Sequence, residues 1–232
     1  SLSYAWNTDD LGTITREYDL GVMPADYAFG IWGAIYMCLL VFTVYQALPA
    51  SSVPDRNDEF IYDTIGFLWM INMIANALWI PVFCLNTTLG FLGGEIIIIV
   101  MLGTALLMSK EANIVSSELN WTETIGIKWG TSLYSGWLSV ATILNTAFLL
   151  KNTGISDGWN ERSWSIGMLW VAAGIYMVNS YLNEDPVYPA VFVWALFGIL
   201  NQNNADIETS VTVIIAVMIT YIVGLTGMKY LA

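Results

Sequence analysis

Histidine is absent from this sequence of 232 residues, and cysteine occurs only twice. Without histidine, the chain lacks the usual protein ligand of haem and zinc, and the usual proton shuttle near neutral pH. Cys38 and Cys84 both fall in apolar stretches without basic neighbours. This setting favours small buried side chains over a disulfide or a reactive thiol. The sequence therefore predicts no metal site and no catalytic residues.

Positive charge is also scarce: 7 Lys and Arg stand against 19 Asp and Glu, for a formal net charge of −12. Such a surface does not suit nucleic acid, and it offers no polybasic patch for anionic lipids. A retinal Schiff base needs a lysine deep in a late helix. Lys229, the late candidate, lies too close to the end of the chain for that role.

Apolar residues dominate what is present: 56% of the chain is hydrophobic and only 11% is charged. This composition predicts an all-α, polytopic integral membrane bundle with about seven hydrophobic segments. Val187–Leu200 is short for a full crossing. The expected segments are Tyr27–Leu48, Phe60–Leu85, Thr88–Met108, Gly130–Leu150, Ser163–Leu182, Val187–Leu200 and Thr209–Ala232.

The segment Gly130–Leu150 combines spanning length with a polar stripe. Five polar residues recur in it at spacings of three and four, which places them along one helix face. Lipid offers no partner for hydroxyls or amides, so this face should turn inward, either onto other helices or onto a ligand. Both interpretations stay open on the sequence alone. The five residues are Ser132, Ser135, Ser139, Thr142 and Asn145.

Two other segments also carry polar groups at membrane depth. Phe60–Leu85 holds Trp69, Asn72, Asn76 and Trp79 at three- and four-residue steps, on one helix face. Glu95 lies in the first half of the next segment. A carboxylate there costs about 2.5–3.5 kcal/mol on insertion scales, so it is expected to be protonated, hydrogen-bonded inward, wet, or close to an interface.

Aromatic residues are abundant, with 11 Trp, 12 Tyr and 9 Phe. Those near segment ends suit the membrane interface. Deep tryptophans beside Asn, Ser and Tyr provide flat apolar walls with a few orienting hydrogen bonds. This pattern favours a planar hydrophobic ligand, whereas bulky packing is the alternative for each tryptophan alone.

Three stretches carry a resemblance to a known family: PADYAFGIWGAIY at 24–36, NALWIPVF at 76–83 and LYSGWLSVATILN at 133–145. They resemble the TspO/MBR family of tryptophan-rich sensory and translocator proteins, matching four of its five helices over about half of the chain. The resemblance implies a cavity among the helices that binds porphyrins or other tetrapyrroles, or sterols. The ligand-binding residues it implies are Trp32, Tyr36, Asn76, Trp79, Glu95, Tyr134, Trp137 and Asn145.

The chain also departs from the short members of that family. No hydrophobic helix precedes Pro24, so a missing or removed N-terminal segment is expected, and Gly30-Ile31-Trp32 is one residue tighter than the family motif and lacks its proline. Three hydrophobic segments follow the last matched helix, as in a longer TspO-related branch. The expected parts are a polar segment at 1–25, a TspO-like four-helix region at 26–150 and three additional membrane helices at 151–232.

The favoured function is a receptor-like or transporter-like membrane protein that binds a planar hydrophobic tetrapyrrole or sterol, without catalysis. The alternative is a non-catalytic structural subunit of a larger membrane complex that contacts other subunits, lipids or pigments. Light-dependent porphyrin breakdown comes third. Membrane lipids and a small hydrophobic ligand are the expected partners, a homodimer or a larger complex stays open, and an organellar membrane is a plausible location.

Overall fold

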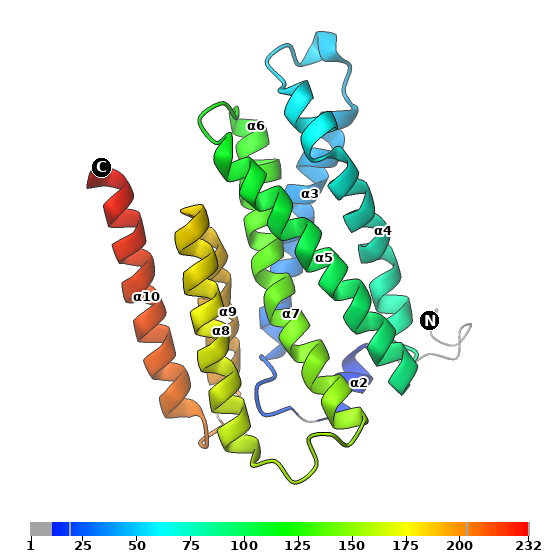
Figure 1. Cartoon of the computed structure of the whole chain (residues 1–232), viewed down its shortest axis with the longest axis vertical. Helices are drawn as coiled ribbons and strands as arrows, with labels where there is room; N and C mark the ends of the chain where they lie inside the picture. The colour runs from blue at the N-terminus through cyan, green and yellow to red at the C-terminus, as the bar shows by residue number, and fades with distance from the viewer. Residues whose placement is uncertain (1–10, 19, 203, 232) are drawn as a thin grey trace.

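The computed structural model describes residues 11–18, 20–202 and 204–231 of the chain. These residues form helices and connecting loops, without strands, and the long helices run up and down side by side (Figure 1). The prediction of an all-α bundle is confirmed. The elements are α2 (Leu11–Glu17), η1 (Asp26–Gly30), α3 (Ile31–Ala47), η2 (Ala50–Ser52), η3 (Glu59–Thr64), α4 (Gly66–Phe83), α5 (Thr88–Ile114), α6 (Trp121–Glu123), η4 (Thr124–Trp129), α7 (Gly130–Asn152), α8 (Glu161–Asn183), α9 (Val187–Leu200) and α10 (Glu208–Leu231).

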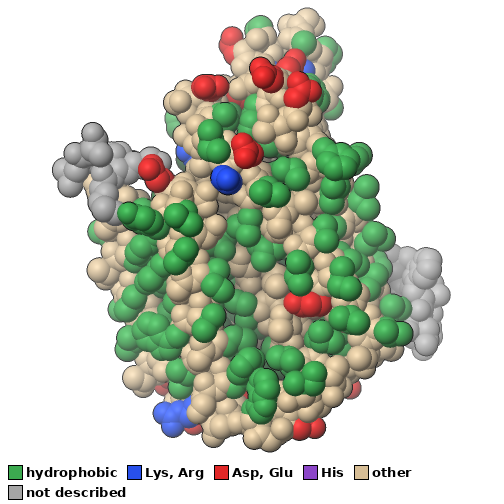
Figure 2. Space-filling view, in the orientation of Figure 1, with side chains coloured by type: hydrophobic (Ala, Val, Ile, Leu, Met, Phe, Trp, Pro, Cys, Tyr) green, Lys and Arg blue, Asp and Glu red, His purple; other side chains and the backbone are tan. Residues whose placement is uncertain are grey.

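Within the described residues, six helical segments are long and apolar enough to cross a membrane. The seventh hydrophobic helix, α9, has 14 residues. It is therefore about 21 Å long, against the roughly 30 Å of a bilayer core. Seven hydrophobic helices are present, but a count of seven full crossings is not confirmed. Figure 2 shows hydrophobic side chains over the middle of the molecule and most charged ones at its two ends, as expected of an integral membrane protein.

The connection before α7 is shorter than the stretch 109–129 that separates the predicted segments Thr88–Met108 and Gly130–Leu150. Helix α5 continues to Ile114, and helical structure resumes at Trp121 and runs through α6 and η4 into α7. Asn120 and Glu123 form a capping box, in which each side chain accepts a hydrogen bond from the other's backbone N–H at 3.0 Å. The sequence Asn-x-x-Glu carries this start signal, which the hydrophobicity pattern alone overlooks.

A buried carboxylate holds the upper loop between α3 and α4 in place. Glu123 is fully buried, and its Oε1 accepts hydrogen bonds from the backbone N–H of Asn57 at 2.9 Å and from the hydroxyl of Tyr45 at 3.3 Å. The side chain of Asn120 donates to the Tyr45 hydroxyl at 2.7 Å. This network ties the loop to the start of the α6–α7 rod and so fixes the upper end of α3.

At the opposite end, the polar N-terminal segment contains the short helix α2, which lies by the lower ends of α5 and α7 (Figure 1). Tyr18 meets Phe91 and Phe148 edge-on, with ring centroids 5.5 and 5.7 Å away. Asn152 donates a hydrogen bond to the Tyr18 hydroxyl at 2.8 Å. The prediction about a segment missing before Pro24 concerns, in part, residues 1–10, which lie outside the described residues.

Helix α7 occupies the centre of the bundle. It packs against α5 on one side and α9 on another, and α3 lies along it as well. Helix α4 reaches the bundle through α5, while α10 and α8 attach through α9 and through each other. Tyr134 and Trp137 on α7 are 0% and 1% exposed. The arrangement makes α7 the helix that faces both halves of the chain.

Candidate functional site

Four of the eight predicted ligand-binding residues meet in what we call the tyrosine cluster: Trp32, Tyr36, Asn76 and Tyr134. They come from α3, α4 and α7. The rings of Trp32 and Tyr36 stack with centroids 5.2 Å apart, one helical turn from each other, and Trp32 meets Tyr134 at 6.0 Å. The Asn76 amide donates to the Tyr134 hydroxyl at 2.7 Å.

The tyrosine cluster is open to its surroundings on one side. Tyr36 is 46% exposed, while Tyr134 behind it is fully buried. The helices on the two sides of this opening pack against different neighbours: α3 packs against η4 and α7, whereas α4 packs against α5. Closer to the upper loop, Phe42 of α3 and Trp69 of α4 close the space, with ring centroids 4.5 Å apart. The cluster therefore faces the lipid side of the bundle with polar groups beneath an aromatic rim.

Three more predicted residues meet in a second group, the asparagine cluster: Trp79, Glu95, Asn145 and, in addition, Thr146. The Asn145 amide donates to Glu95 Oε2 at 2.7 Å, and the Thr146 hydroxyl donates to Glu95 Oε1 at 2.8 Å. The Trp79 indole N–H points at Asn145 Oδ1 at 3.4 Å. Glu95 is thus hydrogen-bonded inward, which is one of the states expected for a carboxylate at this depth.

Trp137, the eighth predicted residue, takes part in none of the hydrogen bonds described for the two clusters. It is 1% exposed, and its ring meets Phe29 edge-on at 5.4 Å. Phe29 in turn lines a small cavity with Trp79 and Asn145. Trp137 therefore packs behind Phe29 and does not line the cavity itself.

The predicted residues do not enclose one ligand-sized cavity. The space beside Trp79 and Asn145 measures about 30 Å³, which is room for roughly one or two waters. A larger apolar groove of about 750 Å³ lies between η1, α3 and α9. Tyr27, Ala34, Ala190 and Trp194 are among its lining residues. Four of its ten lining residues come from α9, a helix that the matched sequence stretches do not include.

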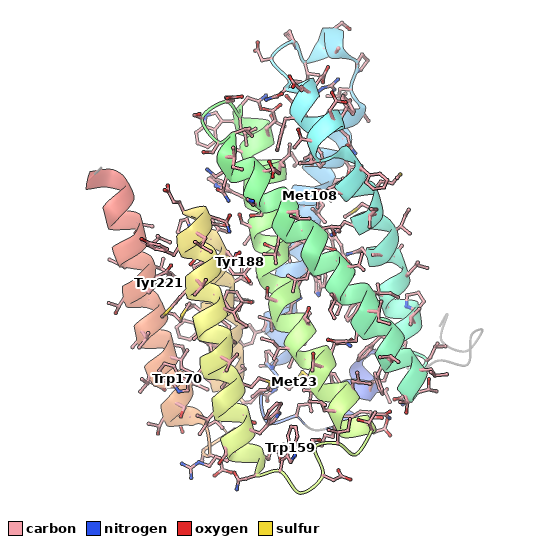
Figure 3. The ribbon with its side chains drawn as sticks, in the orientation of Figure 1. Met23, Met108, Trp159, Trp170, Tyr188 and Tyr221 are labelled. Atoms are coloured by element: carbon pink, nitrogen blue, oxygen red, sulfur yellow. The ribbon has the colours of Figure 1, made fainter. Side chains whose placement is uncertain are left out.

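The polar stripe of α7 spreads over several neighbours. Ser132 lies 3.3 Å from Ser109 of α5, Ser139 lies 2.8 Å from the hydroxyl of Tyr188 on α9, and Asn145 turns toward Glu95. Figure 3 shows Tyr188 on the α7 side of α8 and α9. The stripe points inward as predicted, but most of it joins helices to each other.

The stripe of α4 divides in the same way. Asn72 is fully buried and donates to Met101 O and to Thr104 Oγ1, both at 2.8 Å, which bonds α4 to α5. Asn76, one turn later, instead reaches Tyr134 on α7. Only the second asparagine lies at a surface that a ligand can approach.

Asp185 is a buried acid that lies outside the long membrane-crossing helices. It is 3% exposed at the start of α9, where its Oδ1 accepts hydrogen bonds from the backbone N–H groups of Val187 at 2.9 Å and Tyr188 at 3.3 Å. Burial raises the pKa of Asp185 above its usual range, and hydrogen bonds and the nearby charge of Lys128 offset part of this. The side chain caps the short helix and fixes its upper end.

Residues 1–228 match the family model described as TSPO-like protein. The chain belongs to the TSPO-like family. No curated protein matches the chain, and no solved structure matches it. The family match confirms the resemblance and extends past α7, so α8, α9 and α10 are part of this TSPO-like protein. Together with the six long apolar helices, it identifies an integral membrane protein of the TspO class.

Three residues in or near these sites were not predicted from the sequence. Thr146 follows Asn145 and lies four residues after Thr142, so the spacing of the polar stripe could have predicted it. Phe29 lies inside the matched stretch at 24–36, yet only its contact with Trp137 reveals it as a wall residue. Trp194, which lines the groove, stands out in the sequence only as a deep tryptophan, because its role depends on α9 packing against η1, where its indole donates to Ala28 O at 2.9 Å.

Proposed function

We propose that this TSPO-like protein binds a planar hydrophobic ligand, a tetrapyrrole or a sterol, at the tyrosine cluster. The observation that carries the proposal is the Asn76–Tyr134 hydrogen bond, which lies beneath the stacked rings of Trp32 and Tyr36. A flat ligand can stack on the half-exposed ring of Tyr36 and direct one polar substituent to the amide and phenol groups. The ligand would enter from the bilayer, because that side of the cluster is open.

The family match supports this proposal at the level of class, since it assigns the chain to TspO-like membrane proteins. The proposed role is binding for sensing or transport, without a chemical step. In the sequence, neither histidine nor a cysteine with a basic neighbour is available to act as an acid, a base or a nucleophile.

The test is equilibrium binding of protoporphyrin IX to the purified protein, followed by quenching of tryptophan fluorescence, with cholesterol as a competitor. We expect saturable quenching. Asn76→Ala should raise Kd about tenfold, because it removes the polar group that orients the ligand and one hydrogen bond to a charged substituent contributes about 1.5–3 kcal/mol. Tyr134→Phe should act in the same direction with a smaller effect.

Two control variants locate the site. Trp170→Phe changes an exposed tryptophan of α8, 42% exposed, and should leave Kd unchanged. Ala190→Phe fills the groove between α3 and α9. Loss of binding in Ala190→Phe with normal binding in Asn76→Ala would contradict the proposal and move the ligand to the groove. Trp137→Ala is a poor probe, because removing a fully buried tryptophan costs about 3–5 kcal/mol of stability.

Linear, non-saturable quenching that is equal in all variants would favour the alternative function of a structural subunit. Co-migration of the native protein with a large complex after mild solubilisation would then be the expected result. A free monomer or dimer with saturable binding would support the ligand-binding function.

A further inference from the structure

A third cavity, of about 200 Å³, lies at the lower end of the bundle, and no residue of the two clusters lines it. It is formed by the loop between α7 and α8, the first turns of α8 and the chain segment 20–22. Figure 3 shows Trp159 at this end of the molecule. The residues with distinctive chemistry in its lining are Trp159, Trp164, Lys151, Asp157 and Glu161.

Two tryptophans form an aromatic corner in this cavity. The rings of Trp159 and Trp164 have centroids 4.6 Å apart and planes inclined by 56°. They are 45% and 39% exposed, so part of each ring is accessible. Indoles placed to anchor a helix at the membrane interface need no such pairing. The two rings touch each other, so a cation cannot lie between them, but their accessible faces can attract a quaternary ammonium group placed against the pair.

The loop that presents this corner has a fixed shape. Gly154 and Gly158 adopt φ angles of +72° and +81°, a region that side chains other than glycine rarely enter. Gly158 stands between Asp157 and Trp159, so its turn sets the positions of an acid and an indole on the same cavity. The backbone bond from Asp157 N to Gly154 O, at 3.1 Å, closes the turn.

Charges of both signs line the same cavity. Lys151 Nζ lies 4.0 Å from Glu161 Oε1, and Asp157 adds a second carboxylate. Lys151 lies in the last turn of α7 and Glu161 opens α8, which places the cavity at the end of two membrane-crossing helices. Lipid head groups occupy this level of the membrane. The lining therefore offers one cation, two anions and an aromatic corner where head groups are concentrated.

We propose that this cavity binds the head group of a choline phospholipid. The trimethylammonium group lies against Trp159 and Trp164, with Asp157 and Glu161 as its counter-charges. The phosphate lies toward Lys151, which exchanges part of its contact with Glu161 for it. The apolar lining, which includes Leu150 and Met168, receives the start of an acyl chain.

The chemistry of the lining distinguishes this head group from its competitors. A primary ammonium is compact and strongly hydrated, whereas a trimethylammonium group loses little hydration when it contacts an indole face. An anionic head group without an ammonium would face two carboxylates and one lysine. The shared recognition element is the choline phosphate group, and we assign it to a bilayer lipid because of where the cavity lies.

The experiment is native mass spectrometry of the full chain with equal amounts of three lipids that share the same acyl chains and carry choline, ethanolamine or glycerol head groups. We expect the choline lipid to be retained at least fivefold more than either of the others. Stepwise methylation of the ethanolamine head group should increase retention at each step. Equal retention of all three lipids would overturn the proposal.

Matched variants test the assignment to this cavity. Trp164→Ala should reduce the preference for choline about tenfold, and Trp164→Phe should restore most of it because an aromatic face returns. Trp170→Ala, on the same helix but outside the lining, should retain the full preference. An equal loss in Trp164→Ala and Trp170→Ala would overturn the proposal. Lys151→Gln should weaken all phospholipids together while keeping their order.

A competition experiment with phosphocholine distinguishes a bound lipid from a soluble choline phosphate ligand. If millimolar phosphocholine does not displace the choline lipid, the lipid is the ligand as proposed. If phosphocholine displaces it completely at that concentration, the assignment to a lipid is overturned. The result is independent of the proposed function, because the tyrosine cluster lies on α3, α4 and α7 and is tested with a porphyrin.

Discussion

Helix α7 makes different kinds of contact with the helices on its two sides. On the side of α4 and α5, amide and carboxylate groups make the key bonds, as in Asn76 to Tyr134 and Asn145 to Glu95. On the side of α8 and α9, glycine contacts and hydroxyls do so. A Cβ placed on Gly136 would lie 2.9 Å from Val191 Cβ and 3.0 Å from Tyr188 O. The Tyr176 hydroxyl donates to Gly136 O at 2.5 Å.

This difference separates a contact that leaves polar groups accessible from one that is closely packed. Amide and carboxylate groups keep further hydrogen-bonding capacity, and Tyr36 leaves part of its cluster open. Gly136 and Gly198 instead allow α9 to approach α7 and η1 closely; a Cβ on Gly198 would lie 2.8 Å from Ala28 Cβ. The α4–α5 side therefore keeps polar groups accessible, whereas α9 is held against α7 and η1 by close packing.

The largest expected effect comes from disrupting the close contact between α7 and α9. Gly136→Val should destabilise the protein by about 1–3 kcal/mol or more, because the added methyl groups have no room against α9. The measurement is the midpoint of thermal unfolding in detergent, with proteolysis of the loop at 153–160 as a probe of α8 and α9.

The matched control is Gly103→Val on α5, where no atom would lie within 4 Å of the new Cβ. This variant should unfold within a few degrees of the unchanged protein. Equal destabilisation by both substitutions would contradict the view that α9 is attached through a close backbone approach.

The next effect compares two buried polar groups of α7. Asn145→Ala removes the bonds to Glu95, to Phe91 O and from Trp79, and should cost about 2 kcal/mol in all, since hydrogen bonds between membrane helices contribute about 0.6–1.7 kcal/mol each. Ser139→Ala removes one contact between helices, with Tyr188, besides a bond to Ser135 O within α7, and should cost about 0.6 kcal/mol. Unfolding midpoints in the same detergent measure both, and a larger loss for Ser139→Ala would reverse the comparison.

The smallest effect concerns Asp185 and its pH dependence. Its raised pKa means that the folded state holds the proton more tightly than the unfolded state. The stabilisation by the protonated Asp185 side chain is complete below the unfolded-state pKa of about 3.9. It decreases as pH rises toward the folded-state pKa and is lost above that pKa. Asp185→Asn keeps the oxygen that caps α9 and has no titrating proton.

We therefore expect the stability of Asp185→Asn relative to the unchanged protein to increase as pH rises through that window. At pH 7 it should be at least as stable, whereas Asp185→Ala should lose about 0.5–2 kcal/mol with the helix cap. The measurement is the unfolding midpoint from pH 4 to pH 8. A parallel pH dependence in Asp185→Asn would contradict the role given to the buried acid.

Local patterns predicted the elements of the fold well. The seven hydrophobic runs became helices, and Val187–Leu200 was correctly read as short. Trp32 and Tyr36, four residues apart, share a helix face and stack. Such features depend on residues within one or two turns of each other, so hydrophobic periodicity is sufficient to find them.

Features that require distant segments to meet were not predictable. The spacing of Asn72 and Asn76 places both on one face of α4, but only packing decides that the first bonds α5 and the second bonds α7. The eight predicted ligand residues likewise separate into two clusters and a supporting tryptophan. A sequence without aligned relatives shows which side chains need partners, but it does not show which helix supplies them.

Short stretches of sequence are enough to predict a helical membrane protein of the TspO class, because apolar length and aromatic motifs depend on residues that are close together in the chain. Which side chains stay accessible depends on how distant helices pack. Helix α9 fills the side of α7 that carries Gly136, while Tyr36 stays half exposed beside α4. The physical reason is that close packing depends on shape across helices that are far apart in the chain, and shape of that kind appears only when the helices meet.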